Sequence, residues 1–185
     1  MIARAMILAT VTVVTFLQCA TGAYVTPTLQ VRNPTVGNEF AKLLLWNASA
    51  SAPRGLYLLR PAERLHVGEL VVEQPPASLA NMLAARGSLP LGVPLLKYIA
   101  ALAGQSVCRR HNIVTIDDLA VAVARDRDHL GRPLPVWQGC RTLRAGEVFL
   151  LNPDAPDSFD GRYFGVLPVS TITAGATPLW TEDRP

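Results

Sequence analysis

The chain contains a serine and a lysine whose surroundings suit them to act together as a nucleophile and its base. Ser51 lies in Asn-Ala-Ser-Ala-Ser-Ala-Pro-Arg-Gly-Leu-Tyr, residues 47–57, where a proline and a glycine favour a sharp turn. Lys97 lies in the segment 91–101, which carries no other charge. A serine hydroxyl becomes a good nucleophile when a base takes its proton, and burial can make a lysine that base. The pair therefore predicts acyl-transfer chemistry without histidine.

Lysine is scarce in this sequence, since Lys42 and Lys97 stand against fifteen arginines. Arginine stays protonated near neutral pH, whereas a buried lysine can lose its proton. The more ordinary interpretation of Lys97 is a surface lysine whose stem lies along an amphipathic element. The more ordinary interpretation of Ser51 is a serine in a solvated turn without a catalytic role.

The N-terminal segment predicts export. Arg4 is followed by residues 5–23 without a charge, which is long enough for a helix that spans a bilayer. A cleavable signal peptide ending near residues 21–23, or a lipoprotein signal at Cys19, are alternatives. We therefore expect residues 1–24 to be a signal anchor or signal peptide, 25–38 a linker, and 39–185 the functional domain at the outer face of the membrane.

Export makes the cysteines informative. With Cys19 in the apolar segment, Cys108 and Cys140 remain as an even pair in an oxidising compartment, and a disulfide between them is a hypothesis. The alternative is two unpaired thiols.

The exported part predicts a mainly β domain with few short helices. One helix is expected over Ala77–Arg86, and Leu95–Leu102 fits a helix or a strand equally well. Short strand-forming runs make up most of the rest: Glu39–Trp46, Leu56–Leu59, Leu65–Val72, Ile113–Ile116, Leu119–Ala124, Leu143–Leu150 and Val166–Thr173.

Other kinds of site have little support in the sequence. The net charge of +3 is mild and the arginines are scattered, so we expect no nucleic-acid partner. No spacing of histidines or cysteines suggests a metal, and no cofactor is expected. A triad of Ser51 with a histidine is not excluded, but His66, His111 and His129 lie in charged stretches expected to be exposed. Asp126, Asp128 and His129 are expected in a solvated loop.

Three motifs occur together: the block at 47–57, Leu-Leu-Lys at 95–97, and Ser-x-Asp-x-Arg-Tyr-Phe-Gly at 158–165. In this order they resemble the signal-peptidase-I superfamily of serine–lysine peptidases, with the conjugative-transfer peptidases as the nearest branch. The resemblance covers roughly residues 40–170 and implies the signal-peptidase β-fold.

The resemblance implies a role for each matching residue. Ser51 would be the nucleophile and Lys97 the general base. The oxyanion would be bound by the Ser51 backbone N–H and the Ser49 hydroxyl. Ser158 would hold the lysine amine, and Asp160 and Arg162 would form a supporting ion pair.

The sequence also departs from the family pattern. Gly161 stands where many relatives carry a second serine, and 152–157 replaces a lead-in rich in glycine and asparagine or aspartate. Tyr98 and Ile99 follow the lysine where a basic residue and valine are common. These departures favour a specialised peptidase.

By resemblance, the expected substrate is a pilin precursor of a conjugative transfer system, with cyclisation or hydrolysis as the outcome. The expected location is the periplasmic face of the bacterial inner membrane, where other proteins of the conjugation apparatus are further potential partners. Two alternatives remain: a broader signal peptidase that removes export signals, and a non-catalytic periplasmic assembly component.

Overall fold

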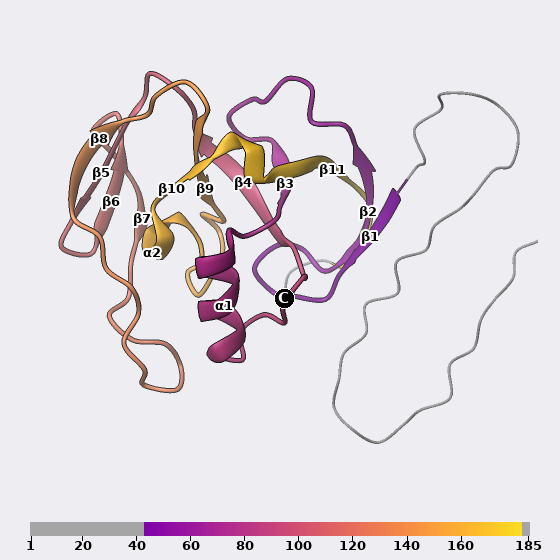
Figure 1. The fold of residues 1–185 in the computed structure, drawn as a ribbon, viewed down its shortest axis with the longest axis horizontal. Coiled ribbons are helices and arrows are strands. Elements are labelled where there is room, and N and C mark those ends of the chain that lie inside the picture. Colours follow the sequence, from indigo (N-terminus) through magenta and orange to yellow (C-terminus); the bar gives the residue numbers. More distant parts are fainter. Residues whose placement is uncertain (1–42, 183–185) are drawn as a thin grey trace, which may run out of the picture.

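The computed structural model describes residues 43–182, which form two β-sheets and two short α-helices (Figure 1). This arrangement confirms the mainly β fold class. The strands are β1 (Leu43–Asn47), β2 (Gly55–Arg60), β3 (Leu70–Glu73), β4 (Leu95–Ala101), β5 (Ser106–Arg110), β6 (Ile113–Ile116), β7 (Leu119–Val123), β8 (Gly139–Thr142), β9 (Glu147–Leu151), β10 (Val166–Pro168) and β11 (Ile172–Thr181). The helices are α1 (Ala77–Ala85) and α2 (Gly161–Phe164), and a 3₁₀ turn spans Val169–Thr171.

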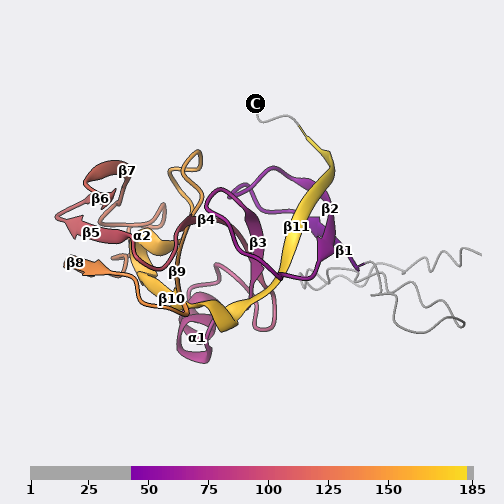
Figure 2. The ribbon, with the colours of Figure 1, turned by 90° about the horizontal axis from the view of Figure 1, so that it is seen from above.

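The larger sheet has seven antiparallel strands in the order β1-β2-β11-β3-β4-β9-β10. The smaller sheet has the order β7-β6-β5-β8 and is also antiparallel. The two views place the smaller sheet at one end of the molecule and β1 at the other (Figures 1 and 2). The central strands β3 and β4 contribute side chains to two separate apolar cores.

The alternation of side chains along β3 and β4 assigns them to two hydrophobic cores. Leu70, Val72 and Leu96 belong to one core, on one face of the sheet. Val71 and Ile99 belong to the other, which α1 covers. Since successive side chains of a strand point to opposite faces, Lys97 points to the same face as Ile99, toward α1.

Helix α1 matches the helix predicted over Ala77–Arg86, one residue shorter. It follows Pro75 and Pro76 and ends before Gly87, and its leucines at positions i and i+4, Leu79 and Leu83, are buried against the sheet.

The secondary structure of two other segments could not be assigned correctly from the sequence. Leu95–Leu102 forms strand β4, because its pairing with β3 and β9 places it in the middle of the sheet. The prediction of one strand over Val166–Thr173 was wrong: β10 ends at Pro168, the chain makes a 3₁₀ turn, and β11 begins at Ile172. Pro168 has no N–H with which to extend the ladder.

Cys108 on β5 and Cys140 on β8 are directly opposite in register and are joined by a disulfide. The bond links the first strand of the smaller sheet to its last strand in sequence. The predicted segments 1–24 and 25–38 lie outside the described residues. Between residues 43 and 182, none of the helices has the length and hydropathy needed to cross a membrane.

Replacing both Cys108 and Cys140 with alanine is expected to lower the free energy of unfolding. The bond closes a loop with a sequence separation of 32, and loops of this size are typically stabilised by about 3–4 kcal/mol. Urea unfolding followed by circular dichroism measures the difference. Reducing agent should destabilise the unmodified protein to a similar extent and leave the variant unchanged; equal stability of the two proteins would contradict the prediction.

Candidate active site

The turn that carries Ser51 is built around the side chain of Asn47, the last residue of β1. The Asn47 amide donates hydrogen bonds to three backbone carbonyls of the turn, those of Ser49 (3.1 Å), Ala52 (3.2 Å) and Pro53 (3.0 Å). Its oxygen accepts from the Ser49 N–H at 3.1 Å. One buried side chain therefore satisfies the polar backbone of the turn and fixes its shape.

The two serines of this turn lie side by side. Their hydroxyl oxygens are 2.8 Å apart, with Ser51 half-buried and Ser49 exposed. The Tyr57 hydroxyl supports the same turn by donating to the Pro53 carbonyl. The turn thus holds the two hydroxyl groups together, and solvent reaches them.

Gly55 is required where this turn enters β2. Its φ is +149°, and a Cβ atom there would lie 2.1 Å from the backbone oxygen of Trp180. A larger residue would push β2 away from β11 and displace the serine turn.

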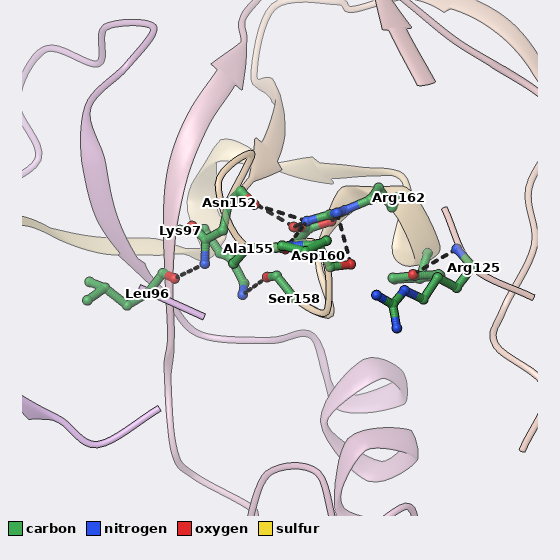
Figure 3. Close-up of polar contacts among 10 residues, drawn as sticks. Leu96, Lys97, Arg125, Asn152, Ala155, Ser158, Asp160 and Arg162 are labelled. Carbon is green, nitrogen blue, oxygen red and sulfur yellow. Dashed lines mark hydrogen bonds and ion pairs between the residues drawn. The ribbon is translucent and has the colours of Figure 1, made fainter. Parts of the chain in front are cut away.

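Lys97 lies in the middle of β4 opposite Val71, and only 1% of it is exposed. Its amine donates a hydrogen bond to the Ser158 hydroxyl at 2.8 Å (Figure 3). Burial lowers the pKa of Lys97 to about 8, with Asp160 and Glu73 acting in the opposite sense and Arg162 reinforcing the decrease. A substantial fraction of this amine is therefore neutral at mildly alkaline pH.

Asp160 and Arg162 form a fully buried ion pair with an O–N distance of 2.7 Å. The Asp160 carboxylate also accepts the backbone N–H groups of Asn152 and Arg162. The Arg162 guanidinium donates to the carbonyls of Asn152, Ala155 and Pro156. The pair thereby organises the loop that precedes α2 and carries Ser158 (Figure 3).

Asn152 joins this loop to the strand of the lysine. Its side-chain amide donates to the carbonyl of Leu96, the residue before Lys97, at 3.1 Å. Arg162 holds the Asn152 carbonyl at 3.0 Å. The Asn152–Leu96 bond and the Lys97–Ser158 bond therefore fix the loop against the strand at two neighbouring residues of β4.

The glycine at position 161 has a steric explanation. A Cβ atom on Gly161 would lie 2.7 Å from the Leu150 backbone oxygen and equally close to the ring of Phe149. A serine does not fit there unless β9 shifts, so the polar support of Lys97 in this loop comes from Ser158.

Ser49, Ser51, Lys97 and Ser158 line one cleft of about 560 Å³. Three segments complete its walls: the end of α1 with the residues that follow it, the loop 125–134, and the loop that carries Ser158. They contribute leucines, arginines and a phenylalanine, among them Leu83, Arg86, Leu89, Arg125, Arg127 and Phe159. The structure thus brings the predicted serine and lysine residues to one concave surface, with apolar and basic walls.

The loop 125–134 is more ordered by contacts than its polar sequence suggests. Asp128, expected to be solvated, pairs with Arg86 at 2.9 Å and Arg132 at 2.8 Å, and its side chain is 13% exposed. These pairs hold the loop against the end of α1 and so help to shape the cleft.

The histidines do not form a catalytic arrangement. His66 and His111 are exposed and line no part of this cleft; His129 reaches it, but no described hydrogen bond joins His129 to a serine or a carboxylate. Across residues 43–182, no three histidine, cysteine or acidic side chains gather closely enough to hold a metal ion.

The sequence analysis missed Glu73, which ends β3. It is completely buried, and neither of its carboxylate oxygens has a hydrogen-bond partner. Burial raises the pKa of Glu73 to about 7, against a smaller lowering by Lys97. In the sequence, a strand-forming run followed by one acidic residue is typical of a strand that ends at the surface. The pattern therefore predicts an exposed carboxylate at position 73, whereas the structure buries it.

The sequence of this chain is similar to a known family and to named relatives. Residues 1–180 match the family described as signal peptidase, peptidase S26. The probable conjugal transfer protein TraF of Sinorhizobium fredii is 34% identical over 145 residues, covering 73% of this chain and 76% of the relative. The conjugal transfer protein TraF of Agrobacterium fabrum is 33% identical over 147 residues, covering 74% and 82% respectively. A crystal structure of a signal peptidase I from Enterococcus faecalis aligns with 62% of this chain and 98% of that one, at 15% identity and a TM-score of 0.37.

Replacing Asp160 with asparagine is expected to destabilise the fold strongly, because it leaves the Arg162 guanidinium buried without a counter-charge. Breaking a buried pair in this way typically costs about 3–5 kcal/mol. Thermal or urea unfolding measures the loss. Asp157→Asn is the matched control, since Asp157 forms an exposed pair with Arg125 and such pairs contribute about 0–1 kcal/mol; similar effects of the two substitutions would contradict this account.

Proposed function

The chain belongs to the signal peptidase family, peptidase S26, and we propose that its peptidase activity uses Ser51 as the nucleophile and Lys97 as the general base. The observation that carries this proposal is the buried Lys97 amine, which shares one cleft with the Ser49–Ser51 hydroxyl pair. A lysine removed from water can act as a base because burial favours its neutral form.

In the first half of the reaction, the Ser51 Oγ attacks the carbonyl carbon of the scissile peptide bond. Its proton passes to the Lys97 amine, which becomes an ammonium group. Negative charge develops on the carbonyl oxygen, where the Ser51 backbone N–H and the Ser49 hydroxyl serve as donors. The carbon–nitrogen bond then breaks, and Lys97 returns the proton to the leaving amine, which leaves an ester on Ser51.

In the second half, an incoming water or amine attacks that ester. Lys97 takes a proton from the attacking group and returns it to Ser51 as the ester bond breaks. Ser158 keeps the amine in place throughout, because its hydroxyl already accepts a hydrogen bond from Lys97. Water as the acceptor gives a linear product, and the amino terminus of the substrate gives a cyclic one.

We assign the substrate to conjugation. Two relatives are named conjugal transfer proteins, and a pilin precursor of a conjugative transfer system is the substrate that best suits a specialised member of the family. The uncharged segment 5–23 supports a location at the periplasmic face of the inner membrane. There the enzyme would meet the exported precursor and other proteins of the transfer apparatus.

Processing of the pilin precursor is expected to stop in Ser51→Ala and in Lys97→Arg. The first variant lacks the nucleophile, and the second carries a guanidinium that does not release its proton. The test is mass spectrometry of the precursor in membranes that contain each variant, and the product mass also separates linear from cyclic pilin.

Three control variants should retain activity: Lys42→Arg, which changes the other lysine, Ser78→Ala, which changes an exposed serine on α1, and His129→Ala. If Lys97→Arg remained active and His129→Ala lost activity, the general base would be His129 and not Lys97. Cleavage of unrelated export precursors at similar rates would instead indicate a general signal peptidase, and activity in Ser51→Ala would remove the catalytic proposal.

The cleavage rate is expected to rise with pH and to level off above about pH 8. The base must be neutral before it can accept the serine proton, and the pKa of Lys97 is lowered to about 8. Below that value kcat/KM should fall by about tenfold per pH unit, because one proton blocks the base. Steady-state rates on a peptide substrate between pH 6 and 10 measure the curve; a midpoint near 6 would indicate a histidine base instead.

A further inference from the structure

Glu73 lies on the same face of the sheet as Lys97. It is opposite Leu95 in the pairing of β3 with β4, while Lys97 is opposite Val71. Glu73 and Lys97 are therefore diagonal neighbours on one face of two paired strands, a relation in which long side chains can reach each other. Both are enclosed by the core that α1 covers.

The burial of Glu73 is unusual for a carboxyl group. No part of the residue is exposed, and both of its oxygens lack a hydrogen-bond partner. Acidic residues are almost never fully buried unless they are paired, because an isolated charge is costly to remove from water. In this position the group requires a compensating interaction.

Lys97 is the cation that the surroundings of Glu73 provide. Along the described chain, α1 and β11 contribute no charged residue, and β4 contributes Lys97 alone. On the next strand, β9, the one charged residue is Glu147, which pairs with Arg141. The electrostatic attraction between Glu73 and Lys97 acts on both groups.

Most of the other charged groups that face Lys97 already have charged partners. Asp160 and Arg162 form their own ion pair, and their effects on the lysine oppose each other. Along the walls of the cleft, Arg86 is paired with Asp128, and Arg125 with Asp157. Arg127 and His129 also line the cleft; both are exposed, and Arg127 donates to the Gly131 carbonyl. Glu73 is thus the acidic group near Lys97 that has no other cation.

We propose that Glu73 is a positioning residue for the reaction, whose carboxylate is the charge partner of Lys97 and stabilises its ammonium form. This inference rests on the proposed function, since it concerns the same base. When Ser51 gives up its proton, positive charge appears on a buried amine, and a nearby carboxylate lowers the free energy of that state. Glu73 makes no bond to the substrate and takes no proton from it.

The proposal predicts two opposite effects of removing the charge. Without the carboxylate, Lys97 loses its proton more readily, so the neutral base is available at lower pH. The same base is weaker, so the rate at high pH falls. A substitution that merely loosens the fold has no reason to move the acid limb of the pH profile to lower pH.

The titration of Lys97 can be followed directly, because the chain has two lysines. In protein with ¹³C-labelled lysine and the background substitution Lys42→Arg, one lysine side-chain signal remains, and its chemical shift against pH reports the pKa of Lys97. We expect Glu73→Gln to lower that pKa by about one unit, within the range typical of a neighbouring opposite charge. Glu73→Met is the second variant, for use if a buried amide impairs folding. Glu63→Gln removes an exposed carboxylate and should leave the titration unchanged.

Peptide cleavage by the same variants completes the test. The acid limb of kcat/KM should move with the measured titration, and kcat at pH 9 should fall several-fold in Glu73→Gln but not in Glu63→Gln. An unchanged Lys97 titration in folded Glu73→Gln and Glu73→Met overturns the proposal even if Lys97 proves to be the base. Full cleavage by Lys97→Arg removes the proposed function instead, while the titration still shows whether Glu73 and Lys97 interact.

Discussion

The removal of one lysine amine from water is the constraint on which the rest of this structure depends. Lys97 sits in the middle of β4, where it is covered by α1 and by the loop 152–160 and has Ser158 as its hydrogen-bond partner. That loop has little secondary structure of its own to hold it, so its shape comes from the Asp160–Arg162 pair and the three carbonyls that Arg162 binds. The buried ion pair therefore has a structural effect: it places the Ser158 hydroxyl against the Lys97 amine.

The loop beside Lys97 contains both an acidic and a basic group, which order it without adding a net charge next to the amine. A single acidic group in the loop would hold Lys97 in its ammonium form, whereas a single arginine would do the reverse. Asp160 and Arg162 instead act on Lys97 in opposite directions, the carboxylate raising its pKa and the guanidinium lowering it. Burial lowers the pKa of the amine and Glu73 raises it, and both of these influences come from the sheet, not from the loop. The loop therefore contributes order and a pair of opposed charges, while the sheet contributes burial and Glu73.

The sequence was informative where chemistry lies in contiguous residues and uninformative where it depends on register. The three motifs identified the family. Helix α1 could be predicted because prolines precede it and a glycine follows it. Leu95–Leu102 could not be assigned, because a short apolar run is compatible with both secondary structures until its partners are known. Glu73 was missed for the same reason: that it lies beside Lys97 follows from the pairing of Val71 with Lys97, which joins residues far apart in the chain. Asn47 and Asn152 were missed as organisers, since an asparagine near a turn looks the same whether it binds water or backbone carbonyls.

Burial of Lys97 and Glu73 has a cost in stability that the rest of the fold must offset. The folded pKa of Lys97 lies below its ordinary value, so the charged amine opposes folding below about pH 8, and this cost disappears as the pH rises above it. The folded pKa of Glu73 lies above its ordinary value, so its cost is absent in acid and grows as the pH rises to about 7. Both costs are therefore close to their full size between pH 7 and 8, and mutual attraction of the two groups offsets only part of them.

The remaining cost in folding free energy must be offset elsewhere in the fold. The apolar cores on both faces of β3 and β4 contribute to this, as do the backbone hydrogen bonds that Asn47, Asn152 and Arg162 make around the cleft. A neutral pair of apolar residues at positions 73 and 97 would give a more stable sheet, but one without a base.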